Sequence, residues 1–144
     1  MKNSLSFLLI GTFCLLLNAC SGQTKESANT EKETTTQEVK TPVYEVLDVD
    51  AFKTELSKGE VKFIDVRTPK EFAAGHIEGA TNINVLDGDF KMQIQEFCQA
   101  GDKVMLYCKS GKRSARASKV LKELGYQQIY DLDGGYLAWS KNNE

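Results

Sequence analysis

The amino-acid sequence predicts an α/β fold in which helices cover both faces of a mainly parallel central sheet. Short apolar runs typical of buried strands alternate with segments whose apolar residues recur at helical spacing. The clearest example is the segment 104–124, where the apolar run Val104–Tyr107 leads through a polar turn into a helical pattern that stops at Gly125. Parallel strands need crossover connections, which are usually helices, so this alternation predicts a parallel sheet.

The expected elements follow one another in a regular order. Strands are predicted over residues 44–47, 61–66, 83–85, 104–107 and 128–132, with helices before Cys98, after Gly111 and over 136–141. We also expect a helix that begins at Asp48 or Asp50 and stops near Gly59. Pro69 should end a strand and precede a short helical turn over 70–74. The helix residues expected to face the core are Phe52, Leu56, Phe90, Ile94, Phe97, Ala117, Val120, Leu121 and Leu124.

The first residues have the pattern of a secretory signal peptide, which we assign to residues 1–19. Lys2 supplies a positive start, and the apolar segment Leu5–Leu17 is shorter than the roughly 20 residues that span a bilayer. The segment closes with Leu17-Asn18-Ala19-Cys20, which resembles the lipobox of bacterial lipoproteins. This resemblance implies that Cys20 is lipidated and that the protein is a membrane-anchored lipoprotein of the cell envelope, on the periplasmic side or at the cell surface. The alternative is a secreted protein in which Cys20 has no special role.

Residues 20–43 are expected to form the lipidated cysteine and a disordered tether. Thr, Glu, Lys, Ser, Asn and Gln make up most of this stretch, as in the segment 30–37. It has too few apolar side chains to offset the entropy cost of ordering the chain. The remaining residues, 44–144, have the length of one ordinary domain.

Charge and cysteine content exclude several classes of function. The chain carries a net charge of -2, so no broad basic field indicates binding to nucleic acid. Of the 4 cysteines, only Cys98 and Cys108 lie in the predicted domain, which is too few for a disulfide framework. A single histidine with two separated cysteines does not make a ligand set, so no metal site is predicted. Cys98 is interpreted as a core residue, with a resolving thiol for Cys108 as the alternative.

The candidate site is the polar turn that follows the strand 104–107. It begins with Cys108 and continues as Lys109, Ser110, Gly111, Lys112, Arg113 and Ser114. The carboxyl ends of strands face the binding crevice of an open α/β sheet, and the first N–H groups of the next helix point toward it. Such N–H groups and nearby cations lower the pKa of a thiol from about 8.5 to roughly 3.5–7.5, which favours the reactive thiolate. Cys108 is therefore the candidate nucleophile, and the alternative is a small buried residue beside a solvated basic helix.

Three segments of the domain resemble the motifs of single-domain rhodaneses. The segment Asp65–Ile83 is similar throughout to the family pattern D-V-R-x-x-x-E-F/Y-x-x-G-H-I-x-G-A-x-N-I. Cys108–Ser114 resembles the active-site loop of that family, and Leu132–Gly135 with Trp139 resembles its usual ending. The three segments occur in the family's order and together cover nearly all of residues 44–139, so we expect a single rhodanese-like domain.

The resemblance implies a rhodanese-type thiosulfate sulfurtransferase that needs no cofactor. Cys108 would take a sulfane sulfur from a small anionic donor such as thiosulfate, become a persulfide, and pass the outer sulfur to cyanide or a thiol. Backbone amides and positive charge would bind the donor and the persulfide, through Lys109, Ser110, Gly111, Lys112, Arg113 and Ser114. Arg113 corresponds to the arginine at the end of the family's loop, and its alternative role is to hold the loop's own carbonyl groups. A monomer is expected, with the membrane contacted through the N-terminal lipid.

Charged residues of the first motif are assigned to the scaffold. In the family the position of His76 supports the fold, and the alternative for this residue is a catalytic role. Arg67 is also expected to be structural, and its alternative is contact with the substrate. Because buried charges need partners, the side chains expected to pair among themselves near the crevice are Asp65, Arg67, Glu71 and Glu78.

Two other functions stay open on these residues. Phosphatases and arsenate reductases of the same fold have one more residue between cysteine and arginine, whereas only residues 109–112 separate Cys108 from Arg113. The shorter loop favours sulfur over phosphate. The second alternative is a non-catalytic or sulfur-carrying module that docks a partner protein, and the cysteine within a cationic loop argues against it.

Overall fold

The computed structural model describes residues 41–142, which contain the predicted domain. The expected signal peptide, the lipidation at Cys20 and nearly all of the expected tether lie outside these residues. Within them, no helix combines the length and the apolar character that crossing a membrane requires.

The described strands form one parallel sheet in the order β1-β5-β4-β2-β3. They are β1 (Val43–Leu47), β2 (Lys62–Asp65), β3 (Thr81–Asn82), β4 (Lys103–Tyr107) and β5 (Gln128–Leu132). β4 lies in the middle, hydrogen-bonded to β2 on one side and to β5 on the other. Residues 104–107 of β4 are all buried, as expected for a strand covered on both faces.

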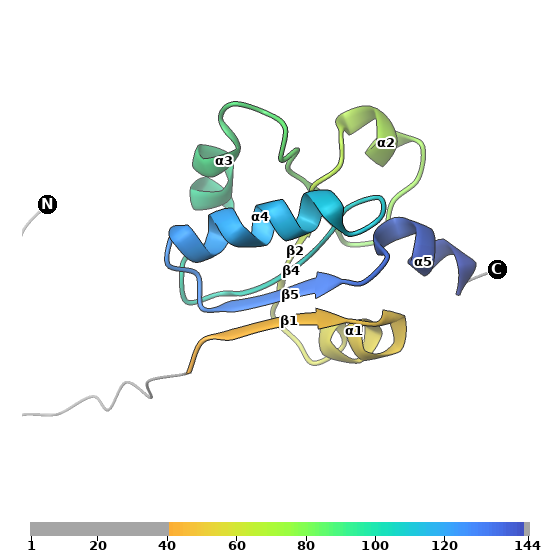
Figure 1. Cartoon of the computed structure of the whole chain (residues 1–144), viewed down its shortest axis with the longest axis horizontal. Helices are drawn as coiled ribbons and strands as arrows, with labels where there is room; N and C mark the ends of the chain where they lie inside the picture. Colours follow the sequence, from red (N-terminus) through yellow and green to blue (C-terminus); the bar gives the residue numbers. More distant parts are fainter. Residues whose placement is uncertain (1–40, 143–144) are drawn as a thin grey trace, which may run out of the picture. The chain divides into compact units, whose positions relative to one another are not determined.

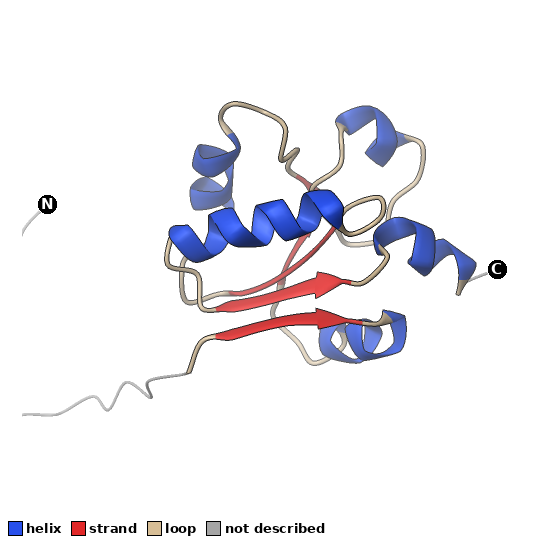
Figure 2. Cartoon of the chain, in the orientation of Figure 1, coloured by secondary structure: helices blue, strands red, loops and turns tan. Residues whose placement is uncertain are grey.

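Helices cover both faces of this sheet (Figure 1). They are α1 (Val49–Leu56), α2 (Pro69–Ala73), α3 (Phe90–Phe97), α4 (Lys112–Glu123) and α5 (Gly135–Lys141). One core cluster joins α3 and α4 to the sheet, and a second joins α1 and α5 to the opposite face. Figure 2 shows the resulting order of helix, sheet and helix layers. The α/β fold with a parallel sheet and helices on both faces is therefore confirmed.

The alternation of side chains along β4 decides which face carries the candidate site. Val104 and Leu106 belong to the core cluster beneath α4, whereas Met105 and Tyr107 belong to the cluster beneath α1 and α5. Successive side chains of a strand point to opposite faces, so the residue after Tyr107 faces α4. Cys108 indeed packs in the α4 cluster.

Two helix starts follow directly from local side-chain chemistry. Asp48 caps α1, because its Oδ1 accepts a hydrogen bond from the Ala51 N–H at 2.9 Å. Thr68 and Glu71 form a reciprocal capping box at the start of α2. Pro69 occupies the first turn of α2, where a backbone N–H would have no partner within the helix and its absence costs nothing. The helix therefore begins at Pro69, one residue before the predicted start.

The short edge strand differs from the prediction over residues 83–85. β3 covers only Thr81–Asn82, and Ile83 and Val85 lie beyond it as buried loop residues. Their N–H groups still bond to the end of β2, from Ile83 to the Asp65 carbonyl at 3.0 Å and from Val85 to the Val66 carbonyl at 3.3 Å. Ile83 and Val85 are apolar because they pack in the core cluster with α3 and α4, and not because they belong to a strand.

Candidate active site

Cys108 directly follows β4, at the carboxyl edge of the sheet. The loop that it begins runs into α4, which starts at Lys112 (Figure 1). The connection is short because Gly111 adopts φ 91°, a left-handed conformation that glycine accepts without a side-chain penalty. The turn brings the start of α4 back over the end of β4, so that its first N–H groups face the thiol.

The sulfur of Cys108 lies in a cradle of backbone N–H groups. The Gly111 N–H donates to Sγ with an N–S distance of 3.2 Å. The N–H groups of Ser110, Arg113 and Ser114 also interact with it. The residue is only 1% exposed, so almost all of the thiol is in contact with protein rather than solvent.

Two opposing effects set the pKa of Cys108. Burial raises it, because a thiolate is poorly solvated inside the protein. Hydrogen bonds from the Ser114 hydroxyl and from the N–H groups of Ser114, Ser110 and Arg113 lower it, and they prevail, so the pKa of Cys108 lies below that of an ordinary thiol. The loop therefore favours the thiolate form of Cys108.

The first turn of α5 holds the Cys108 loop through backbone hydrogen bonds. The Tyr136 N–H donates to the Cys108 carbonyl at 2.8 Å, and the Leu137 N–H donates to the Lys109 carbonyl at 3.1 Å. Gly135 permits this approach, since a Cβ at that position would lie 2.9 Å from Lys109 C and Ser110 N. The sequence indicates the Gly134-Gly135 pair only through its resemblance to the family's ending, and sequence spacing does not show that the pair lies close to the loop.

Arg113 is held by Glu71 of α2. Nη1 lies 2.7 Å from Glu71 Oε2, and Nη2 lies 2.7 Å from Glu71 Oε1. The hydrogen bond to Arg113, with help from Thr68, lowers the pKa of Glu71 to about 2. The expectation that Glu71 would pair with the other charges of its own motif is wrong, because its partner comes from the candidate site. Of the described residues, the Arg113 side chain hydrogen-bonds Glu71 and no carbonyl of the loop.

A buried ion pair lies at the end of the neighbouring strand. Asp65 is 0% exposed and Arg67 is 3% exposed, and Arg67 Nη2 lies 2.6 Å from Asp65 Oδ2. The guanidinium also donates to the Gly75 carbonyl at 2.7 Å and stacks 4.2 Å from the centre of the Tyr136 ring. Arg67 is thus part of the scaffold that joins β2, the turn after α2, and α5, as the sequence predicted.

The remaining loop side chains divide into exposed and buried groups. Lys109, Ser110 and Lys112 are exposed, whereas Ser114 is completely buried on the inward face of α4. The exposed lysines add positive charge beside the loop, where an anionic ligand would approach.

Cys98 and His76 take no part in the cradle. Cys98 is 3% exposed within the core, its thiol donates to the Ile94 carbonyl at 3.3 Å, and burial raises its pKa. His76 stacks on Phe72 with a centroid separation of 3.8 Å, and its Nδ1 lies 3.1 Å from the Phe72 carbonyl. Across residues 41–142, no three or more His, Cys, Asp or Glu side chains are grouped to hold a metal ion.

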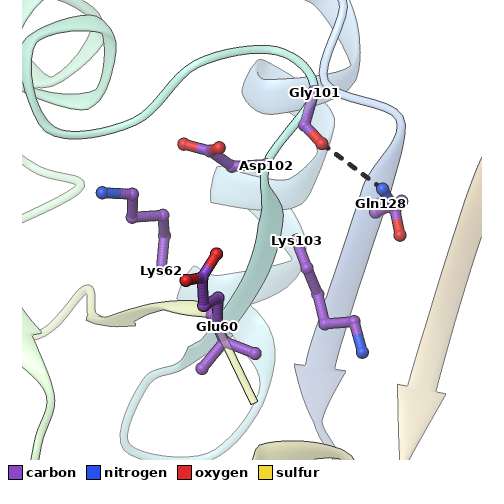
Figure 3. A pocket seen from close by; sticks show the side chains of 7 residues that line it. Glu60, Lys62, Gly101, Asp102, Lys103 and Gln128 are labelled. Atoms are coloured by element: carbon purple, nitrogen blue, oxygen red, sulfur yellow. Dashed lines mark hydrogen bonds between the residues drawn. The ribbon is translucent and has the colours of Figure 1, made fainter. Parts of the chain in front are cut away.

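A cavity lies at the opposite edge of the sheet from Cys108. It has a volume of about 600 Å³ and lies where β2, β4 and β5 begin (Figure 3). Acidic and basic side chains of Glu60, Lys62, Asp102 and Lys103 line it together. Its lining residues are exposed or half-buried, and the mixed charges select no single ligand class. The converging donors around Cys108 therefore identify the functional site better than cavity size does.

Comparison with known proteins identifies the family. The model of the rhodanese-like domain matches residues 48–142. Thiosulfate sulfurtransferase 18 of Arabidopsis thaliana is 35% identical, over 65% of this chain and 76% of its own. The mitochondrial protein HIGH ARSENIC CONTENT 1 of the same plant is 33% identical, over 89% of this chain and 84% of its own.

A solved structure gives the same result. The human single-domain sulfurtransferase TSTD1 is 26% identical with a TM-score of 0.63, and the match covers 71% of this chain and 100% of the human one. The chain is thus an α/β protein with a cysteine loop at the carboxyl edge of its sheet. It belongs to the family of rhodanese-like domains.

Proposed function

We propose that the protein is a sulfurtransferase that carries sulfane sulfur as a persulfide on Cys108. The observation that carries this proposal is the convergence of loop N–H groups on Sγ, with the Gly111 N–H at 3.2 Å. These donors favour a thiolate, and they would equally favour the terminal negative charge of a persulfide. The names of relatives such as thiosulfate sulfurtransferase 18 support the same activity.

The reaction requires two nucleophilic displacements. The Cys108 thiolate attacks the outer sulfur of thiosulfate, the S–S bond of the donor breaks, and sulfite leaves with the bonding electron pair. Cyanide or a thiolate then attacks the outer sulfur of the persulfide, which releases thiocyanate or a new persulfide and restores the Cys108 thiolate. No net oxidation or reduction of the enzyme is needed, and no cofactor enters either step.

Positive charge near the loop suits an anionic donor. Lys109 and Lys112 are exposed beside Cys108, and Arg113 is fixed one residue further by Glu71. Because Arg113 is already neutralised in part by its carboxylate partner, we assign the first attraction of the donor to the lysines. Arg113 then contributes a rigidly placed guanidinium and its backbone N–H.

The test is formation of thiocyanate from thiosulfate and cyanide by the purified full-length protein. We expect turnover by the wild type and by Cys98→Ala, and none by Cys108→Ser. Phosphate-ester hydrolysis or arsenate reduction that depends on Cys108, without thiocyanate formation, would contradict the proposal. That outcome matters because one relative is named for arsenic content.

A partner-docking module is the competing function. It predicts that Cys108→Ser leaves biological activity intact and that the wild type fails to accept sulfur from any small sulfane donor. Loading of the wild type by thiosulfate or by a small persulfide would exclude a purely structural role for the loop.

We also propose that the protein works in the cell envelope as a lipoprotein anchored through Cys20. The support is the lipobox-like segment Leu17–Cys20 after a short apolar run. Metabolic labelling with a radioactive fatty acid in a bacterial host should mark the wild type and leave Cys20→Ser unlabelled. Equal labelling of both proteins, or of neither, would contradict the anchor.

A further inference from the structure

The inward face of α4 carries two serines above a carboxyl group of β5. Ser114 and Ser118 lie one helical turn apart and are 0% and 9% exposed, while Asp131 is 5% exposed. Asp131 pairs with Leu106 in the register of β5 and β4. Leu106 and Cys108 face α4 together, so Asp131 faces the same side of the sheet. The thiol, the serines and the carboxyl group therefore lie between β4, β5 and α4.

The hydroxyl of Ser114 has one proton to donate and several acceptors around it. Oγ donates to the Gly111 carbonyl at 2.9 Å, and the same hydroxyl interacts with the Cys108 sulfur and with the Asp131 carboxylate. A hydroxyl group donates one hydrogen bond but can accept others at the same time. A protonated Asp131 can donate a hydrogen bond to Ser114 Oγ, whereas an ionised Asp131 competes with the Gly111 carbonyl and the Cys108 sulfur for the single hydrogen bond that Ser114 donates.

Asp131 has fewer hydrogen-bond partners than a buried carboxylate needs. No described residue donates a hydrogen bond to its Oδ1, and the Oγ of Ser118 is likewise unpartnered within that part of the chain. None of the ion pairs in residues 41–142 includes it. Burial raises the pKa of Asp131 to about 7, although the Ser114 hydroxyl and the Leu132 N–H oppose that rise and the charge of Asp133 adds to it.

Other ionisable groups face Asp131 across a small cavity of about 150 Å³. Tyr44 and Glu45 of β1 and Lys122 of α4 line it together with Asp131 and Ser118. Lys122 Nζ lies 4.3 Å from the centre of the Tyr44 ring and makes no ion pair with Asp131. From β4, the neighbour in register is the apolar Leu106, and the next titratable group on the same face of the sheet is Cys108, since Tyr107 packs on the opposite face.

We propose that Asp131 is a positioning residue that acts on Cys108 through Ser114. When protonated, its carboxyl group donates to Ser114 Oγ and no longer competes for the Ser114 hydrogen bond, which is then shared between the Gly111 carbonyl and the Cys108 sulfur. When ionised, the carboxylate accepts the Ser114 proton, and the thiolate or persulfide loses that donor. The inference rests on the proposed function only in taking Cys108 as the reactive thiol. It adds that the protonation state of Asp131 controls how strongly the Cys108 thiolate is stabilised.

The experiment measures the rate of Cys108 alkylation by iodoacetamide as a function of pH. The full-length protein is used, and peptide mass spectrometry reports on Cys108 alone. Because the two groups interact, the wild type should titrate over a broadened range rather than as one thiol. Asp131→Asn presents a permanent N–H donor to Ser114, so its profile should narrow to one step, with a midpoint lower by on the order of one pH unit.

A double-variant comparison shows whether the effect passes through Ser114. Ser114→Ala should raise the midpoint, and adding Asp131→Asn to it should change nothing further. Asp133→Asn is the matched control. This exposed acid acts on Asp131 only through its charge, so the substitution should shift the profile slightly and leave it broadened.

Three results would overturn the proposal. They are an Asp131→Asn profile that matches the wild type, an undiminished effect of Asp131→Asn in the Ser114→Ala protein, and an equal effect of Asp133→Asn. If Asp131→Asn does not fold, Ser114→Ala decides alone, because a broadened profile that persists without the Ser114 hydroxyl contradicts the coupling. Alkylation needs no sulfur donor. The experiment therefore tests the role of Asp131 even if the protein proves not to transfer sulfur.

Discussion

Arg113 and Glu71 form a bidentate ion pair that joins the first turn of α4 to the first turn of α2, with both N–O distances at 2.7 Å. The two side chains are 24% and 29% exposed, so solvent screens the pair only in part. The pair ties the Cys108 loop to the motif that contains Arg67. It also makes loop geometry depend on the charge of one glutamate.

Glu71→Gln should lower the free energy of unfolding at pH 7 by about 1 kcal/mol, the upper range for a partly exposed pair. The pKa of Glu71 is lowered to about 2 in the folded protein, from 4.5. The stabilisation is therefore complete above pH 4.5 and is lost as the pH falls toward 2. Urea unfolding at pH 7 and pH 3 should show that the difference between wild type and variant shrinks at the lower pH.

Glu78→Gln is the control for that measurement, because Glu78 is exposed and forms no ion pair within residues 41–142. A pH-independent difference for Glu71→Gln, or an equal loss for Glu78→Gln, would show that the ion pair does not stabilise the fold.

Arg113→Ala should reduce kcat/KM for thiosulfate by about tenfold or more, because it removes a fixed positive charge and leaves Glu71 to repel the anion. Cys98→Ala should have little effect on the same parameter, since Cys98 lies in the core away from the cradle. Steady-state kinetics over a range of thiosulfate concentrations would measure both. Equal losses from the two substitutions would contradict the roles assigned to these residues.

Gly135→Ala should disturb the Cys108 loop, because the new Cβ would lie 2.9 Å from Lys109 C and Ser110 N. A left-handed conformation alone imposes roughly 1 kcal/mol of strain on alanine. We expect the sulfur-transfer rate of Gly135→Ala to fall by more than that strain would explain. Gly125→Ala is the matched control, since its φ is also positive at 88° but no atom lies within 4 Å of the added Cβ. If both variants retain equal activity when folded, the contact between α5 and the loop is unimportant for catalysis.

Cys108 should be alkylated at pH values below those that Cys98 requires. Hydrogen bonds outweigh burial and lower the pKa of Cys108, whereas burial raises the pKa of Cys98. Both thiols are buried, so each serves as the internal control for the accessibility of the other. Peptide mass spectrometry after timed exposure to iodoacetamide would rank them, and a higher midpoint for Cys108 would remove the electrostatic basis of the proposed mechanism.

The fold could be predicted because its main signals are local. The apolar run Val104–Tyr107, the turn glycine Gly111 and the helical pattern after it occur within one short segment, and they correctly predict β4, the loop and α4. The prediction failed at β3, because Ile83 and Val85 are buried without belonging to a strand. Burial and strand geometry leave the same apolar pattern in a short segment.

Contacts between distant residues of the site could not be predicted in the same way. Glu71 and Arg113 are 42 positions apart, and nothing in the chain between them indicates their pairing. Asp131 lies in a strand whose other residues are mainly apolar, and only the packing of α4 reveals that its carboxyl group faces Ser114. The role of Gly135 likewise depends on the approach of α5 to the Cys108 carbonyl.

Sulfur loading of Cys108 is best measured by intact mass, on the reduced protein before and after treatment with thiosulfate. If the loop stabilises a persulfide, the wild type gains the mass of a single sulfur atom, cyanide removes it with release of thiocyanate, and Cys108→Ser gains nothing. A wild type that stays at its original mass with every small sulfane donor, or a gain that persists in Cys108→Ser, would show that this thiol does not carry the sulfur.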